Sequence, residues 1–235
     1  MSTAVAGASR GRAPAWLVVL RKDLRLELRT LETVPAMILF SLAIFVIFHF
    51  GLGRQSVAGQ EAAGILVVTL LFASMLAVNR LFVAEREQGG FEGFLLAPVD
   101  RSALLLAKAS ALFLFMAALE VIAVPGFALL LLGPPLGRVL GPLVAVLALA
   151  DGAVAVIGTL VSAIAVQTRA RDLIGPIVGL PLQIPALIAA ARALGPLLVR
   201  HGSTSPPGEW LLVLALYDLL FALVAYAVFD FLLED

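Results

Sequence analysis

The sequence predicts an all-α membrane protein, with an N-terminal amphipathic helix at the membrane surface followed by six transmembrane helices. The chain of 235 residues is 62% hydrophobic and only 14% charged, with a mean hydropathy of +1.08. Several of its apolar stretches reach the ~20 residues that cross a hydrocarbon core, about twice the length of a barrel strand. Because lipid offers the backbone no hydrogen-bond partners, such stretches must be helical.

The elements follow in order along a single domain, residues 16–235, after a tail at 1–15 that is rich in Ala, Gly and Arg and is expected to be disordered. Residues 16–33 predict the surface helix. Its leucines share one stripe, and Lys22, Asp23, Arg25 and Arg29 lie away from the centre of that stripe. The six spans are expected at 34–50, 62–83, 102–132, 141–166, 173–191 and 210–233.

Basic residues are distributed unequally between alternate connections. The tail with the surface helix, the second connection and the fourth hold six, four and two Lys or Arg, against four on the other side. Since cytoplasmic loops carry the basic excess, we expect both termini in the cytoplasm. Pro176, Pro181 and Pro185 predict a bend in the fifth span. If that span is instead re-entrant, the C-terminus lies on the other side.

The second connection, 85–101, is a densely charged island between two apolar runs, and we interpret it as a docking surface. Gly89-Gly90 is a poor helix interior and predicts a hinge before a short helix. Phe91 and Phe94 share a face of that helix, and Pro98 ends it. The alternative is an ordinary solvated loop with an interfacial anchor. The docking interpretation assigns Glu85, Arg86, Glu87, Gly89, Gly90, Phe91, Glu92, Gly93, Phe94, Pro98, Asp100 and Arg101 to the contact with a partner.

Polar residues inside the spans are a second group of candidates. Glu120 and Asp151 each predict either a gate or a hydrogen-bonded contact between helices, since a carboxylate facing lipid would be costly. Asp218 predicts packing or a place at the membrane interface, and Lys108, near the start of its span, can reach back to that interface as an anchor. His49 and His201 are the two histidines of the chain that could ligate a metal such as iron, and neither lies in a motif that favours it.

The composition excludes other classes of protein. There is no cysteine, and net charge is zero, so disulfides, thiol catalysis and nucleic-acid binding have no support. We find no metal-binding or catalytic motif and no phosphate-binding loop, so any nucleotide hydrolysis that drives this protein must belong to another polypeptide. A stand-alone secondary transporter would show inverted repeats and paired broken helices, and only the fifth span is broken.

The order of these parts resembles the membrane subunit of a type-2 ABC exporter. More narrowly, residues 83–87 and 93–101, followed by Lys108 and by Glu120 ahead of Pro125, resemble the CcmB family of c-type cytochrome maturation. The tail and residues 192–209 lie outside this resemblance. A permease of another type-2 exporter, for lipid, polysaccharide or drug, is the alternative.

The resemblance implies a permease in the inner membrane that binds no cofactor directly and pairs with a CcmA-like ATPase and with a second copy of itself. It also implies CcmC-like and CcmD-like membrane partners, and a CcmE-like chaperone that receives haem. The cargo is then haem itself, or the ATP-driven step releases the haem-loaded chaperone.

Overall fold

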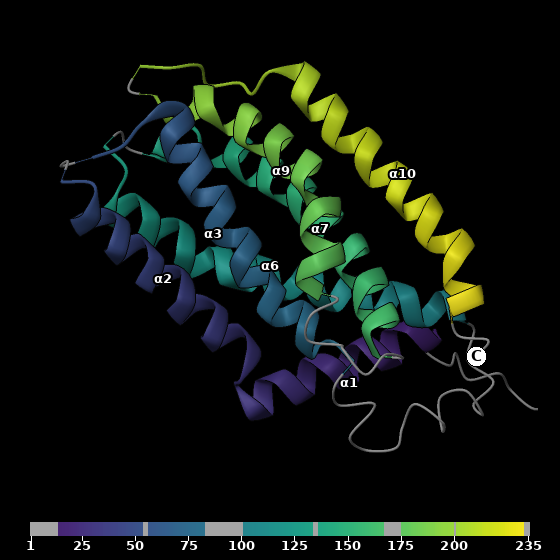
Figure 1. Ribbon diagram of the computed structural model, residues 1–235. Helices are drawn as coiled ribbons and strands as arrows, with labels where there is room; N and C mark the ends of the chain where they lie inside the picture. Colours follow the sequence, from purple (N-terminus) through teal and green to yellow (C-terminus); the bar gives the residue numbers. More distant parts are fainter. Residues whose placement is uncertain are drawn as a thin grey trace, which may run out of the picture.

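The computed structural model describes residues 14–53, 56–82, 101–133, 136–166, 175–199 and 201–232. In this part of the chain the structure is helical, and six helices are long and apolar enough to cross a membrane, as predicted. Figure 1 shows these six running side by side, with α1 lying across one end of the bundle. The helices are α1 (Ala15–Thr30), α2 (Thr33–Gly51), α3 (Gly59–Arg80), α6 (Arg101–Leu130), α7 (Leu140–Val166), α9 (Leu180–Leu194) and α10 (Gly208–Leu232).

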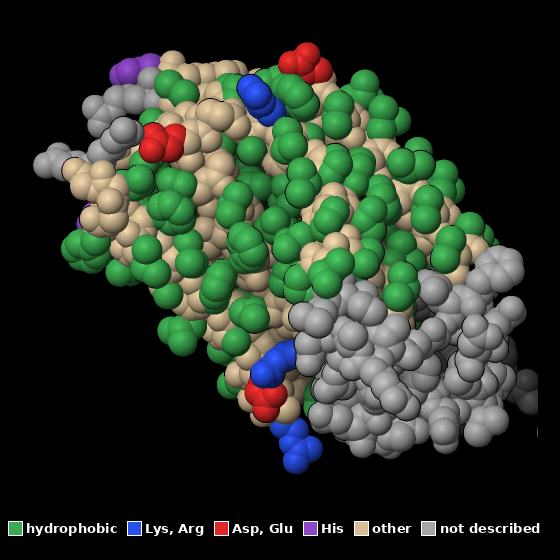
Figure 2. All heavy atoms as spheres, viewed as in Figure 1, with side chains coloured by type: hydrophobic (Ala, Val, Ile, Leu, Met, Phe, Trp, Pro, Cys, Tyr) green, Lys and Arg blue, Asp and Glu red, His purple; other side chains and the backbone are tan. Residues whose placement is uncertain are grey.

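The centre of the bundle is formed by α3 and α7. About two thirds of each of their apolar spans is buried, 67% in both, against 17% for α2 and 11% for α10. The two outer helices pack against opposite sides, α2 on α3 and α6, and α10 on α7 and α9. Figure 2 shows what this leaves outside: hydrophobic side chains cover the visible flank, and charged side chains gather at its two ends. That distribution suits a lipid-facing flank.

The fifth span is one uninterrupted helical segment in spite of its prolines. A π-helical turn at Gly175–Gly179 contains Pro176, α9 follows directly, and a 3-10 turn at Gly195–Leu198 ends it. The segment 175–198 is long and apolar enough to cross a membrane. Likewise, α6 continues through Pro125 to its end at Leu130.

A two-residue turn joins the surface helix to the first span. Leu31 adopts the left-handed conformation with φ 51°, and α2 begins at Thr33. The Glu27 carboxylate of α1 accepts hydrogen bonds from the backbone N–H groups of Thr33 (2.9 Å) and Val34 (2.7 Å). These belong to the first turn of α2, where N–H groups have no partner within the helix and where negative charge is favourable. Glu27 therefore caps α2 from outside it.

We predict that Glu27→Ala lowers the free energy of unfolding by about 1 kcal/mol, because two N–H groups lose their acceptor. Thermal unfolding of the detergent-solubilised chain measures the effect. Glu27→Gln is the matched control, since its amide oxygen still accepts, and it should lose less. Equal melting temperatures for all three proteins would mean that the cap contributes nothing.

At the end of the bundle opposite α1, two connections are joined through their backbones. Val57 N–H donates to the Leu131 carbonyl (2.8 Å), and Gly133 N–H donates to the Val57 carbonyl (3.3 Å). The contact ties the connection between α2 and α3 to the end of α6. It fixes α3 and α6 to each other at this end without relying on side chains.

Candidate functional site

The predicted docking surface falls largely outside the described residues. Glu85, Arg86, Glu87, Gly89, Gly90, Phe91, Glu92, Gly93, Phe94, Pro98 and Asp100 all belong to the undescribed part of the chain, and Arg101 is the first residue of α6. The structure does describe the two supports of this segment, which are the end of α3 with Leu81 and Phe82, and the start of α6. Both supports lie at the α1 end of the bundle (Figure 1).

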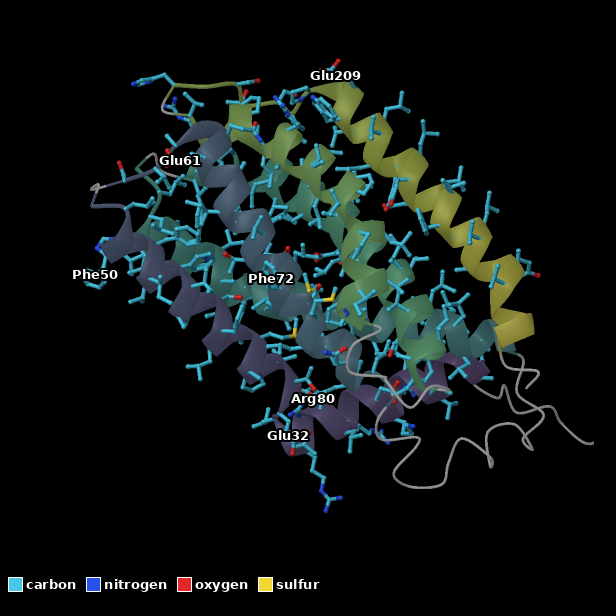
Figure 3. The ribbon with its side chains drawn as sticks, in the orientation of Figure 1. Glu32, Phe50, Glu61, Phe72, Arg80 and Glu209 are labelled. Atoms are coloured by element: carbon cyan, nitrogen blue, oxygen red, sulfur yellow. The ribbon has the colours of Figure 1, made fainter. Side chains whose placement is uncertain are left out.

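An exposed ion pair marks the end of α3. Arg80 Nη1 lies 2.8 Å from Oε2 of Glu32, which sits in the turn between α1 and α2. Figure 3 shows the two side chains meeting at the end of the bundle. Their side chains are 50% and 63% exposed, so the pair adds only ~0–1 kcal/mol to stability.

A buried ion pair lies deeper at the same junction. Lys108 of α6 is 1% exposed, and its Nζ lies 2.9 Å from Asp23 Oδ2 of α1. The same ammonium donates a hydrogen bond to the Leu81 carbonyl (2.9 Å) and lies 5.1 Å from the ring centroid of Phe82. The expectation that Lys108 reaches the membrane interface is therefore wrong. A closer set of partners satisfies its charge inside the bundle.

Asp23 differs from its predicted place. The leucine pattern predicts it away from the centre of the buried stripe of the surface helix, but it is 8% exposed and is buried together with Val19 and Leu20. The sequence spacing indicates this burial, because Asp23 lies three and four residues after Leu20 and Val19, and residues so spaced share a helix face. The buried face of α1 is thus rotated from the predicted leucine stripe, and Leu28 and Leu31 are exposed.

A second polar contact holds the last turn of α3 from the other side. The Ser162 hydroxyl of α7 donates to the Val78 carbonyl (2.8 Å). Carbonyls in the last turn of a helix have no partner within it, and leaving them unpaired in a low-dielectric interior is costly. Val78 also accepts a weaker bond from the Leu81 N–H (3.4 Å), and Lys108 bonds to the Leu81 carbonyl just past the helix, so α6 and α7 both hold the end of α3.

Two carboxyl groups interact halfway along the bundle, and a third lies on a neighbouring helix at a similar depth. Asp151 of α7 is 3% exposed and lies within electrostatic range of Glu120 of α6. Gly152 follows Asp151 on α7, and a Cβ built on it would lie 2.9 Å from Oδ2 of Asp218 of α10. The Asp218 carboxyl thus packs against α7 at the residue next to Asp151. Each of the three is about 15 Å along its helix from the end opposite α1, at 1.5 Å per residue.

Glu120 and Asp151 thus bring α6 and α7 together, and Asp218 of α10 packs against α7 next to them. Oε1 of Glu120 and Oδ1 of Asp218 are buried and have no hydrogen-bond partner among the described residues. Whether Glu120 and Asp151 serve in helix packing or in a gate stays a prediction. Among the residues that the structure describes, no group of three His, Cys, Asp or Glu could hold a metal ion.

The two histidines lie at the end opposite α1. His49, in the last turn of α2, makes a short contact between its Nδ1 and the Leu130 carbonyl of α6, and its ring meets that of Phe50 edge-on. His201 is exposed, with φ 63°. The structure does not bring them together with other metal-ligating side chains in the described part of the chain.

Comparison with known proteins places this architecture in a family. In Rhodobacter capsulatus, the protein named Heme exporter protein B is 32% identical to this chain over 114 residues, which are 48% of this chain and 52% of that protein. Its namesake in Escherichia coli K12 is 30% identical over 94 residues, 40% of this chain and 43% of that protein. The chain thus spans about half the length of the curated relatives it matches.

The match to a family model is more extensive. The model described as CcmB protein covers residues 14–231, which run from the residue before α1 to the last turn of α10. The resemblance drawn from residues 83–101 is thereby confirmed, and the chain belongs to the CcmB family.

Proposed function

We propose that this chain is the permease subunit of an ABC transporter required for haem delivery or export to the periplasm during c-type cytochrome biogenesis. The proposal rests mainly on the match to the CcmB family model over residues 14–231, together with relatives named Heme exporter protein B. ATP hydrolysis takes place on a separate CcmA-like subunit, so the chain itself is not an enzyme. It couples that hydrolysis to haem export or to release of the haem-loaded chaperone.

We place the chain in the inner membrane with both termini in the cytoplasm. The basic residues support this orientation, because twelve of the sixteen fall on the side that holds the tail, the second connection and the fourth. With this orientation the end of α3 and the start of α6 project segment 85–101 towards a cytoplasmic ATPase. The same orientation places His49 and His201 on the periplasmic side.

The partners follow from the family. A CcmA-like ATPase docks on 85–101, CcmC-like and CcmD-like proteins share the membrane, a CcmE-like chaperone receives haem, and a second copy of this chain completes the permease. In the contact with the ATPase, Phe91 and Phe94 fill an apolar groove while Glu85, Glu87 and Glu92 face basic residues. Aromatic side chains at the centre of an interface carry most of its binding energy, whereas exposed charge pairs carry little.

We predict that the double substitution Phe91→Ala with Phe94→Ala abolishes co-purification of the CcmA-like ATPase while membrane insertion is unchanged. Each buried aromatic anchor contributes about 2 kcal/mol or more to an interface, so losing both weakens binding far below the level that survives purification. The measurement is a pull-down of the ATPase from detergent-solubilised membranes.

The matched control removes two aromatic rings elsewhere. Phe50 is exposed at the end of α2 opposite α1 and Phe72 is exposed midway along α3 (Figure 3), and Phe50→Ala with Phe72→Ala should leave the pull-down intact. An undiminished pull-down of the Phe91, Phe94 variant would contradict docking. Because the chain has no cysteine, Glu92→Cys also offers a unique labelling site, and labelling from outside the cell would overturn the orientation.

A further inference from the structure

The buried side chain of Lys108 connects its own helix, α6, to two others. It lies 2.9 Å from Asp23 Oδ2 of α1, it donates to the Leu81 carbonyl just past the end of α3 (2.9 Å), and its own backbone belongs to α6. Phe82, 1% exposed, covers it with its ring at 5.1 Å. A displacement of α6 at this junction must therefore carry α1 with it or break the ion pair, and a displacement of the α3 end must carry Lys108 or break its hydrogen bond.

Stability alone does not explain this arrangement. Burying an ammonium and a carboxylate costs desolvation that their attraction only partly offsets, and well-packed apolar residues often replace such pairs without loss. The pair is also not an ideal one, because Asp23 Oδ2 lies close to Nζ but has no hydrogen-bond partner of good geometry in the described residues. An ion pair provides a specific, directional connection between two helices, which apolar packing does not.

The neighbouring Glu32–Arg80 pair offers a comparison at the same junction. It joins the end of α3 to the region of α1, at 2.8 Å, but both side chains are at least half exposed to solvent. Water and salt screen such a contact, so it transmits little force. The buried pair thus joins α1 to α6, whereas the exposed pair joins the turn after α1 to the end of α3, so the two lie at one junction in different dielectric environments.

We infer that Asp23 and Lys108 are positioning residues, through which movement of the α3 end and the α6 start is passed on to α1. The inference rests on the proposed function, since those two helix ends flank the segment assigned to ATPase docking. Neither residue contacts nucleotide or cargo in this role. The pair converts a displacement at the docking segment into a displacement of the surface helix.

The test replaces the pair by apolar residues of similar size, as Asp23→Leu with Lys108→Met. The complex with the CcmA-like ATPase is purified, and its thermal stability and ATPase content are measured. We expect both to match the native complex, whereas maturation of c-type cytochromes in cells falls by roughly tenfold, in the range seen for residues that carry coupling. Glu32→Gln with Arg80→Gln is the control and should mature cytochromes normally.

A distance measurement follows the movement directly. Val18 of α1 and Leu129 of α6 are 56% and 85% exposed, and both can be changed to spin-labelled cysteine in a chain that has no other cysteine. We expect ATP to shift the distribution of distances between the labels in the native complex. In the apolar double variant the shift should be absent, and in Asp23→Glu with Lys108→Arg, which keeps both charges, it should persist.

Each result decides the question. Normal cytochrome maturation, or an ATP-dependent shift, in the apolar double variant overturns the positioning role. A complex that is destabilised or loses its ATPase shows that the pair only holds the fold, which overturns it as well. If the native complex itself neither retains an ATPase nor responds to ATP, the proposed function fails and the inference fails with it.

Discussion

Replacing Gly158 by leucine is expected to prevent the bundle from assembling. Gly158 lies on α7 where it meets α3 and α6, and a Cβ built there would lie 2.7 Å from both Leu112 Cδ2 and Val78 Cγ2. Val78 and Leu112 are fully buried, and a β-branched valine has little freedom to turn away. Small residues let helices approach this closely within a membrane.

The smaller substitution Gly158→Ala gives a measurable step. Inserting one methyl group into a tightly packed core costs about 1–3 kcal/mol, and the branched side chain of leucine costs more. Unfolding in mixed micelles with increasing dodecyl sulfate measures the loss. Gly64→Ala on α3 is the matched control, because no atom lies within 4 Å of its Cβ position, and it should be neutral or slightly stabilising. Equal losses at the two glycines would contradict the close approach at Gly158.

Replacing Gln183 by methionine is expected to stabilise the protein. The Gln183 side chain on α9 is 0% exposed, and both its amide nitrogen and its oxygen lack a hydrogen-bond partner in the described residues. Its Nε2 lies near Gly179, which also faces Met75 of α3 and Val161 of α7. An unsatisfied buried amide costs about 1–3 kcal/mol, and methionine fills a similar volume without that cost.

The melting temperature of the solubilised chain checks this prediction. Thr69→Val is the control, because Thr69 is equally buried but its hydroxyl already donates to the Ile65 carbonyl (2.7 Å), so no gain is expected there. A lower melting temperature for Gln183→Met would show that the amide is satisfied in the folded protein. A higher melting temperature combined with lost cytochrome maturation would mean that the amide is kept for function.

The spans could be predicted from the sequence because one physical requirement dominates them. A helix that crosses lipid needs length and an apolar surface, and both are local properties of the chain. Accordingly, the third span was expected at 102–132 and α6 is Arg101–Leu130, while the fourth was expected at 141–166 and α7 is Leu140–Val166. The ends differ by only a few residues, because helix caps are less distinctive than apolar runs.

The polar contacts could not be predicted in the same way, because they depend on how helices pair. Lys108 looked like a residue near a membrane interface until the position of α1 supplied a carboxylate next to it. The leucine pattern predicts Asp23 away from the centre of the buried stripe, whereas the bundle buries the face of α1 that holds Val19, Leu20 and Asp23. The meeting of Glu120 with Asp151 likewise depends on the crossing of α6 and α7, which no local pattern specifies.

The backbone contact between Val57 and residues 131 and 133 determines how the molecule can change shape. It closes the far end of the α3 and α6 pair, whereas near α1 the same two helices are held through side chains such as that of Lys108. If α3 and α6 move apart, the distance between them therefore changes least at this backbone contact. It changes most at the opposite end of the two helices, where α1 lies.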